Sequence, residues 1–339
     1  MFVSAIEGGY SKKIAVLSFV LSVLVVIRHT INISTYGLSG GVLYHLERIL
    51  KVITALAVPT FFSMSGFLFF HNYSSDTLLI KWRRRVNSIV IPYFLWNLIP
   101  YIILLFFSAI PAIGAQMNQQ IEPLSFRTVL RNAVWGYHNI TWFLRSLILY
   151  ILITPFLYPV LKHKIAGMLL ILAFFLANCW IESLYFCYFP LYLIGAYFGI
   201  NFHTTVYKRN TKSAVIVSAV ALAATVLLEL SALYDVIGSN FLYYILRSVQ
   251  VALLWICADC FNYDIKIRWW MSISFFIYCS HSLILEAVEK VILIVLGCNM
   301  AGAWVDLLCA PVITLTIIFC IAAFLRKTKY IWPIISGGR

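Results

Sequence analysis

The sequence predicts an all-α integral membrane protein, a bundle of about ten transmembrane helices with both termini in the cytoplasm. Of its 339 residues, 63% are hydrophobic and 11% are charged, whereas soluble domains are about 45–50% apolar and 25% charged. Apolar runs of spanning length follow one another along the chain, and basic residues concentrate in alternate loops. These observations exclude a soluble globular protein and predict one transmembrane domain over residues 1–339.

Ten apolar runs have the length of about 17 to 25 residues that a bilayer requires. They cover residues 14–31, 49–70, 88–110, 140–161, 165–181, 184–200, 214–233, 241–260, 271–296 and 303–325. The first run is too long for a typical signal sequence and has no small-residue cleavage site, so we interpret it as a transmembrane helix. The longest loop, residues 111–139, is polar and short for a folded domain.

The distribution of positive charge predicts the orientation. An even number of spans puts both termini on one side, and most of the 25 Lys and Arg residues then share that side. The opposite loops keep Arg48, Lys51, Arg127 and Arg131. Because positive charge is retained in the cytoplasm, this asymmetry predicts cytoplasmic termini. It also accounts for the net charge of +13 without a nucleic-acid partner.

The eight cysteines show neither a disulfide framework nor a metal site. Almost all of them lie in apolar runs, and Cys257-x-x-Cys260 has no second pair and no nearby histidine ligand. We therefore interpret them as packed thiols. No metal-ligand set or nucleotide-binding loop is apparent, so we expect neither a metal nor a bound cofactor.

Charged and histidine residues inside the predicted spans are candidates for a functional site, because an unpaired charge there costs several kcal/mol. Counting 1.5 Å per residue places His29 about 22 Å from the cytoplasmic end of its helix. Arg28, Arg145 and Arg247 are expected at a similar depth, in the outer half of the bilayer, which predicts a polar cavity there. Snorkelling and structural ion pairing remain the alternative, and Glu286 with Lys290 has the i,i+4 spacing of an ion pair.

A basic cluster, Lys81-Trp-Arg-Arg-Arg85, precedes the third span. Topology alone explains a positive cluster at this position. Arginine is also well suited to bidentate phosphate binding. The cluster therefore predicts either a topological signal or a site for a phosphorylated cytoplasmic ligand.

Six short motifs occur in the order typical of the membrane acyltransferase-3 family, which the chain resembles. They are Val23 to His29, Pro59 to Phe67 (PxFFxxSGF), Arg84 to Trp96 (a basic cluster followed by PYxxW), Thr141 to Leu144 (WFL), Phe189 to Gly195 and Ser272 to His281. Each motif is weak alone, but six in order, from the first to the ninth span, are specific.

The resemblance implies a ten-helix bacterial enzyme of the inner membrane. Members of this family move an acyl group, usually acetyl, from cytoplasmic acyl-CoA to a hydroxyl of a cell-surface or exported glycan. By resemblance, His29 is the essential histidine and Arg83, Arg84 and Arg85 contact acyl-CoA. Many members carry a second arginine three residues after the first, where this chain has Ser88, so we expect Arg83 or Arg84 to substitute for it.

These inferences combine into a mechanistic hypothesis. His29 is expected to act as general base on the acceptor hydroxyl, with Arg28, Arg145 or Arg247 stabilising the oxyanion. An acyl-histidine intermediate is the alternative order of events. Candidates for contacting the acceptor or orienting the base are Trp142, Glu182, Tyr278, His281 and Glu286.

The expected partners are acyl-CoA as donor, a glycan or lipid-linked saccharide as acceptor, and the bilayer itself. The sequence leaves the oligomeric state, the acceptor and the acyl chain open. A secondary transporter or a glycan exporter is the competing interpretation, since outer-half charges in a multi-pass bundle also suit a carrier.

Overall fold

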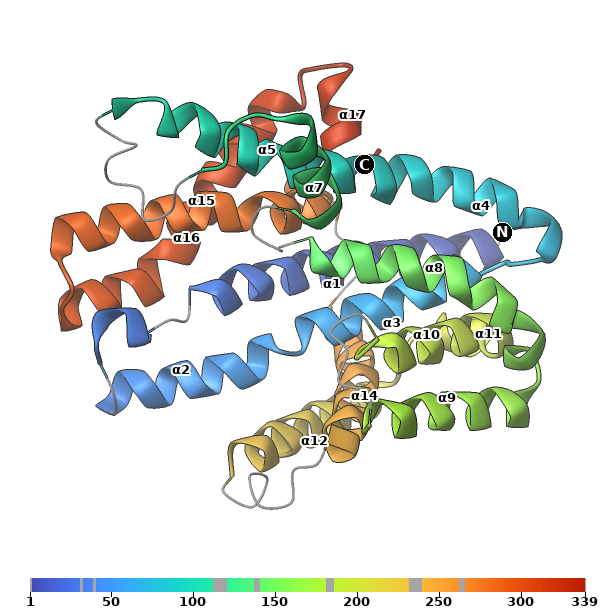
Figure 1. The fold of residues 1–339 in the computed structure, drawn as a ribbon. Helices are drawn as coiled ribbons and strands as arrows, with labels where there is room; N and C mark the ends of the chain where they lie inside the picture. Colours follow the sequence, from blue (N-terminus) through green and yellow to red (C-terminus); the bar gives the residue numbers. More distant parts are fainter. Residues whose placement is uncertain are drawn as a thin grey trace.

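The computed structural model describes residues 2–30, 33–38, 41–111, 121–136, 141–180, 186–231, 240–261 and 266–338, and every regular element within these ranges is helical. Most of the long helices lie side by side, parallel or antiparallel, in one bundle (Figure 1). This confirms the all-α prediction.

The longer helices, in chain order, are α1 (Phe2–His29), α2 (Gly41–Thr54), α3 (Ala57–Phe70), α4 (Leu78–Arg85), α5 (Ile91–Ser108), α7 (Phe126–Trp135), α8 (Trp142–Leu161), α9 (Lys164–Asn178), α10 (Phe189–Asn201), α12 (Lys212–Leu230), α14 (Asn240–Cys257), α15 (Ser274–Leu296) and α16 (Met300–Leu325). Two short helices, α11 (His203–Val206) and α17 (Ile331–Ile335), complete the set in the described residues.

Within the part of the chain that the structure describes, seven helical stretches are long and apolar enough to cross a membrane: Tyr10–His29, Gly41–Phe70, Ser75–Ser108, Trp142–Leu161, Lys212–Leu230, Leu242–Cys260 and Met300–Leu325. The predicted spans 165–181, 184–200 and 271–296 are also helical, as α9, α10 and α15. Of these, α9 and α10 have only 15 and 13 residues. The chain is thus a multi-pass membrane protein, while a total of ten spans and the side of the termini stay predictions.

Three helices begin at least eight residues earlier along the chain than the apolar pattern indicated. The first of them, α1, begins at Phe2, whereas the first predicted span starts at residue 14. The second predicted span starts at residue 49, but α2 begins at Gly41 and leads almost directly into α3. The third starts at residue 88, but α4 begins at Leu78 and continues through a π-helical turn, Val86–Val90, into α5. In the latter two places charged side chains interrupt the hydrophobic run without ending the helix, since Lys and Arg are good helix formers.

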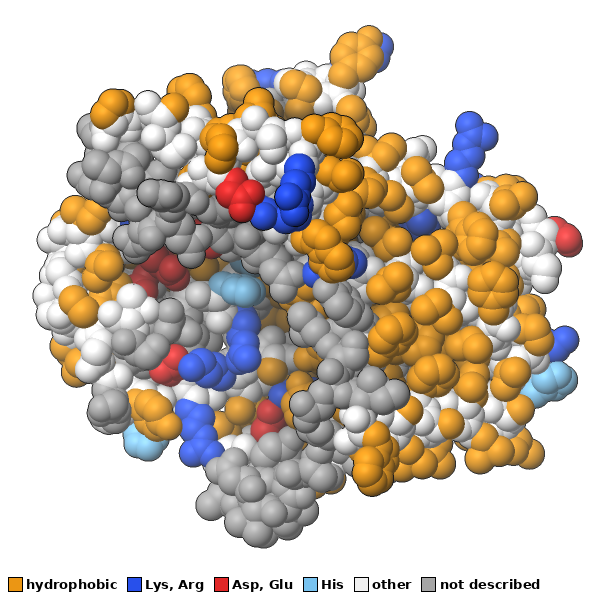
Figure 2. All heavy atoms as spheres, viewed as in Figure 1, with side chains coloured by type: hydrophobic (Ala, Val, Ile, Leu, Met, Phe, Trp, Pro, Cys, Tyr) orange, Lys and Arg blue, Asp and Glu red, His pale blue; other side chains and the backbone are white. Residues whose placement is uncertain are grey.

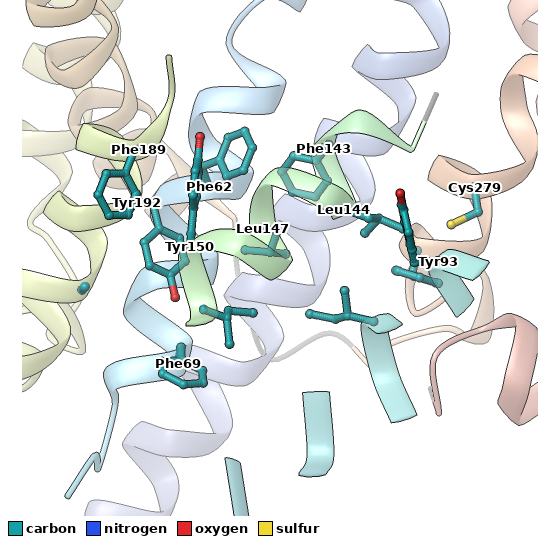
Figure 3. Packing of buried hydrophobic residues seen from close by; sticks show 14 of the residues in the cluster. Phe62, Phe69, Tyr93, Phe143, Leu144, Leu147, Tyr150, Phe189, Tyr192 and Cys279 are labelled. Carbon is teal, nitrogen blue, oxygen red and sulfur yellow. The ribbon is translucent and has the colours of Figure 1, made fainter. Parts of the chain in front are cut away.

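The core of the bundle is formed around α1 and α3. Helix α1 contacts α2, α3, α15 and α16, while α3 contacts α1, α8, α10 and α14. The Ser22 hydroxyl donates a 3.2 Å hydrogen bond to the Ser274 carbonyl and so fixes the register between α1 and α15. Figure 3 shows Phe143, Leu144 and Leu147 of α8 between Tyr150 and Tyr192 on one side and Tyr93 and Cys279 on the other.

Glycine permits the close crossing of α3 and α10. A Cβ atom on Gly195 would collide with the Ser63 carbonyl oxygen, and one on Gly66 would collide with that of Tyr192. Small residues allow two membrane helices to approach until their backbones touch. Gly66 and Gly195 therefore have a packing role at this crossing.

We expect Gly195→Ala to destabilise the protein by about 1–3 kcal/mol, because the new methyl group cannot fit without separating α3 from α10. Thermal unfolding of the detergent-solubilised protein measures the effect. Ala223→Val serves as the control, since Ala223 is exposed on α12. An unchanged melting temperature for Gly195→Ala would show that the crossing is looser than described.

The long predicted loop, residues 111–139, contains the helix α7, which is hydrogen-bonded to α5. Side chains of α5 bond backbone carbonyls of this segment: Asn97 Nδ2 donates to Ala133 (2.8 Å), the Tyr101 hydroxyl to Glu122 (3.0 Å) and the Tyr93 hydroxyl to Val134. An exposed ion pair joins Arg131 Nη1 to Glu122 Oε1 at 2.7 Å. The hydrogen bond from Arg131 holds the pKa of Glu122 below its usual range. The loop is therefore partly ordered rather than irregular throughout.

Candidate functional site

Two histidines from distant parts of the sequence face each other inside the bundle. His29 ends α1 and His281 lies in α15, with their ring centroids 5.0 Å apart. His29 is exposed, whereas His281 is completely buried. Because α1 and α15 are packed in fixed register, the backbone holds both rings at the same level. We call these two residues the histidine pair.

The neutral tautomer of His281 follows from its contacts. Its Nδ1 lies 2.6 Å from the Tyr278 carbonyl oxygen, which can only accept a hydrogen bond. A neutral ring must therefore carry its proton on Nδ1 and keep a lone pair on Nε2. This Nε2 is buried and has no hydrogen-bond partner among the described residues. Since an unpaired buried acceptor is costly, its presence beside His29 is typical of a functional site.

Charged side chains surround the exposed side of the pair. Arg28 and Glu286 both lie within electrostatic range of His29. Arg28 Nη1 also donates to the Lys51 carbonyl oxygen (2.8 Å), and Glu286 Oε1 accepts from the Ser282 hydroxyl (3.0 Å). Figure 2 shows acidic, basic and histidine side chains gathered left of centre and a mainly apolar surface on the right. The structure thus brings Arg28, His29, His281 and Glu286 together.

The other two predicted arginines have different surroundings. The Arg145 guanidinium stacks on the Trp135 ring of α7, 5.0 Å from its centroid. Arg247 is buried and forms an ion pair with Glu229 of α12, and its Nη1 donates to Gln250 Oε1 (2.9 Å). The Arg247 guanidinium also lies over the Tyr243 ring, 5.0 Å from its centroid, so its contacts join α12 to α14.

The remaining acceptor candidates are only partly connected to the site. Tyr278 lies one turn before His281, with the two rings 6.1 Å apart. Trp142 packs instead against Phe62 and Tyr188, at centroid distances of 6.3 and 6.0 Å. Glu182 lies outside the described residues.

A narrow inner cavity of about 90 Å³ leads toward the histidine pair. Its lining residues come from α1, α3, α8, α15 and the segment around the π-helical turn. Along α3 the lining runs from Val58 to Leu68, a length of about 15 Å at 1.5 Å per residue. The lining includes Arg85 and also Tyr278, which lies three residues before His281 in α15. The cavity therefore connects the basic cluster with the neighbourhood of the pair.

The three arginines of the basic cluster differ in exposure. Arg83 and Arg84 are exposed, while Arg85 is half-buried and lines the inner cavity. Arg85 is the last residue of α4, and the π-helical turn that follows it includes Ser88. Such turns change the direction of the side chains that follow and are frequent at functional sites. We call this side of the bundle, where α3 ends and α4 lies, the basic end.

Two polar features were missed in the sequence. Asp306, buried in α16, hydrogen-bonds with Tyr36, and its position inside an apolar run was the available signal. Lys81 was noted only as part of the basic cluster, but its Nζ donates to the Phe69 and His71 carbonyl oxygens (2.8 and 2.7 Å). No spacing rule predicts that contact, because the turn after α3 creates it.

Fold and site together define a class: a multi-pass helical membrane protein with a histidine pair near a cavity whose wall includes an arginine of the basic cluster. The acyltransferase-3 family model, described as an acyltransferase domain, matches residues 13–325. The chain belongs to this family of membrane acyltransferases, which confirms the resemblance seen in the motifs. The comparison with curated proteins and the comparison with solved structures gave no match.

Proposed function

We propose that this membrane acyltransferase moves an acetyl group from cytoplasmic acetyl-CoA to a hydroxyl of a cell-surface or exported glycan. One observation carries the proposal: the inner cavity leads from Arg85 at the basic end toward the histidine pair. The basic end would face the cytoplasm of a bacterial cell, because positive loops are retained there. The exposed side of His29 would then receive the acceptor from the opposite end.

The donor would enter from the basic end. Arg83, Arg84 and Arg85 would hold its phosphates, for which the arginine fork has the right geometry. The largely apolar walls of the inner cavity suit the slender, uncharged arm that links the phosphates to the thioester. Its small volume favours a short acyl group such as acetyl over a long chain. The thioester carbon would thereby reach Tyr278 and the histidine pair.

The chemistry requires one base and one anion-stabilising group. His29 would take the proton of the acceptor hydroxyl while its oxygen attacks the thioester carbonyl carbon. Arg28, next to His29, would stabilise the tetrahedral oxyanion. When the carbon–sulfur bond breaks, the thiolate of CoA would recover the proton from His29. His281 Nε2 presents a second acceptor to the same space, and Glu286 would orient the acceptor hydroxyl.

We expect Arg85→Ala to raise the KM for acetyl-CoA by about ten- to a hundredfold, the effect of losing one charge-assisted hydrogen bond of about 1.5–3 kcal/mol. The measurement is transfer of labelled acetyl from acetyl-CoA to endogenous glycan in inverted membrane vesicles. Arg127→Ala is the matched control, since Arg127 is an exposed arginine in the first turn of α7. Its KM should equal that of the parent.

Two results would count against the proposal. An unchanged KM for Arg85→Ala would separate the basic cluster from donor binding. A parent chain that labels no acceptor from acetyl-CoA, but carries a solute across the same vesicles, would favour the transporter or exporter interpretation. The same assay tests three expectations: that the transferred group is acetyl, that the acceptor is a glycan, and that acetyl-CoA is used without a bound cofactor.

A further inference from the structure

A second, wider cavity opens at the basic end, next to the inner cavity. Its volume is about 340 Å³, and its lining residues are Tyr10, Ser11, Ile14, Leu68, His71 and Tyr207. Leu68 also lines the inner cavity, so the two cavities have this residue of α3 in common. We call the wider one the aromatic cavity.

Three rings from three parts of the chain line the aromatic cavity. Tyr207, which follows α11, lies 4.4 Å from Tyr10 of α1 and 5.3 Å from His71 at the end of α3, centroid to centroid. Phe67 packs behind them, 6.1 Å from Tyr207 and 5.7 Å from Tyr10. Flat aromatic and imidazole faces around an open hollow suit a planar heterocycle, which gains by stacking on them.

Positive charge lies directly beside these rings. Lys81 Nζ is fixed on the carbonyl oxygen of His71, and Lys81 interacts electrostatically with Arg84 and Arg85. Arg85 in turn lines the inner cavity. The basic end therefore brings together an aromatic cavity, a group of cations and the narrow apolar cavity.

This combination matches the parts of an acyl-CoA, which are a purine, phosphates and a slender arm ending in the thioester. We infer that the aromatic cavity is the subsite for the adenine ring of the donor, with Lys81 joining the arginines at the phosphates. The inference rests on the proposed function, because it assigns a part of the same donor. It adds Tyr10, His71, Lys81 and Tyr207 to the residues that recognise that donor.

The test compares two donors, acetyl-CoA and acetyl-phosphopantetheine, which keeps the thioester arm but lacks the adenine nucleotide. We expect Tyr207→Ala to raise the KM for acetyl-CoA about tenfold, as expected for one lost stacking contact. Its kcat/KM for acetyl-phosphopantetheine should equal that of the parent. Tyr207→Phe keeps the ring and should behave as the parent with both donors. Tyr330→Ala, at an exposed tyrosine near the chain's end, is the control.

The outcomes separate this inference from the proposed function. If the parent uses both donors with the same kcat/KM, or if Tyr207→Ala impairs both equally, the adenine subsite is wrong while acetyl transfer stands. If the parent uses neither donor, the proposed function fails and the subsite with it. If Tyr207→Ala does not accumulate in the membrane, His71→Ala replaces it. That variant changes a different lining residue of the aromatic cavity and is compared with the parent on the same two donors.

Discussion

Replacing His29 with alanine is expected to lower acetyl transfer by about 10²- to 10⁴-fold, the usual contribution of a positioned general base. The ring is exposed and lies 5.0 Å from the fully buried His281. Alanine removes the base without adding a group that fills its place. The rate is measured as labelled acetyl transferred per protein molecule in inverted membrane vesicles.

The comparison needs two controls, one for correct folding and one for a non-specific effect of replacing a histidine. His163→Ala provides one, because His163 is exposed between α8 and α9. Membrane levels and melting temperature of each variant show whether the bundle remains intact. A folded His29→Ala protein with the parent's rate would exclude His29 as the base. It would also exclude the alternative mechanism with an acyl-histidine intermediate at His29.

Arg247→Met is expected to destabilise the bundle by about 3–5 kcal/mol, because it leaves the Glu229 carboxylate buried without its partner. Arg247 is 2% exposed, and its guanidinium bonds both Glu229 and Gln250. Adding Glu229→Gln to this variant should restore most of the stability, since the double variant buries no unpaired charge. Thermal unfolding in detergent measures all three proteins.

The same variants distinguish a structural from a catalytic Arg247. If the arginine only holds α12 to α14, the stable double variant keeps its acetyl transfer. If it stabilises the oxyanion, as the sequence suggested, the double variant is stable but inactive. Arg131→Met is the matched control: it breaks an ion pair in which both side chains are half exposed, and such pairs contribute little to stability. A full loss of stability in the double variant would contradict the ion-pair explanation.

Charge depth alone was a poor guide to which arginines meet. Arg28, Arg145 and Arg247 have similar predicted depths, but depth is one coordinate, and position around the bundle depends on helix packing. The structure places Arg28 by His29, Arg145 on Trp135 and Arg247 against Glu229. Hydropathy fixes where a residue lies along the membrane normal and carries no signal for which helices are neighbours.

The sequence by itself determined the helical membrane fold and the family and made His29 a candidate catalytic residue, because apolar runs and ordered motifs are local properties of a chain. Only the tertiary structure decided that His281 lies against His29, although the two residues are far apart in the sequence. The hydrogen bond between Ser22 and Ser274, which are 252 residues apart, sets the register of the two helices. The tertiary structure also decided that Leu68 lines both cavities and that Lys81 donates a hydrogen bond to the His71 carbonyl oxygen. These contacts depend on how α1, α3 and α15 pack, which is set by side-chain shape across the whole bundle.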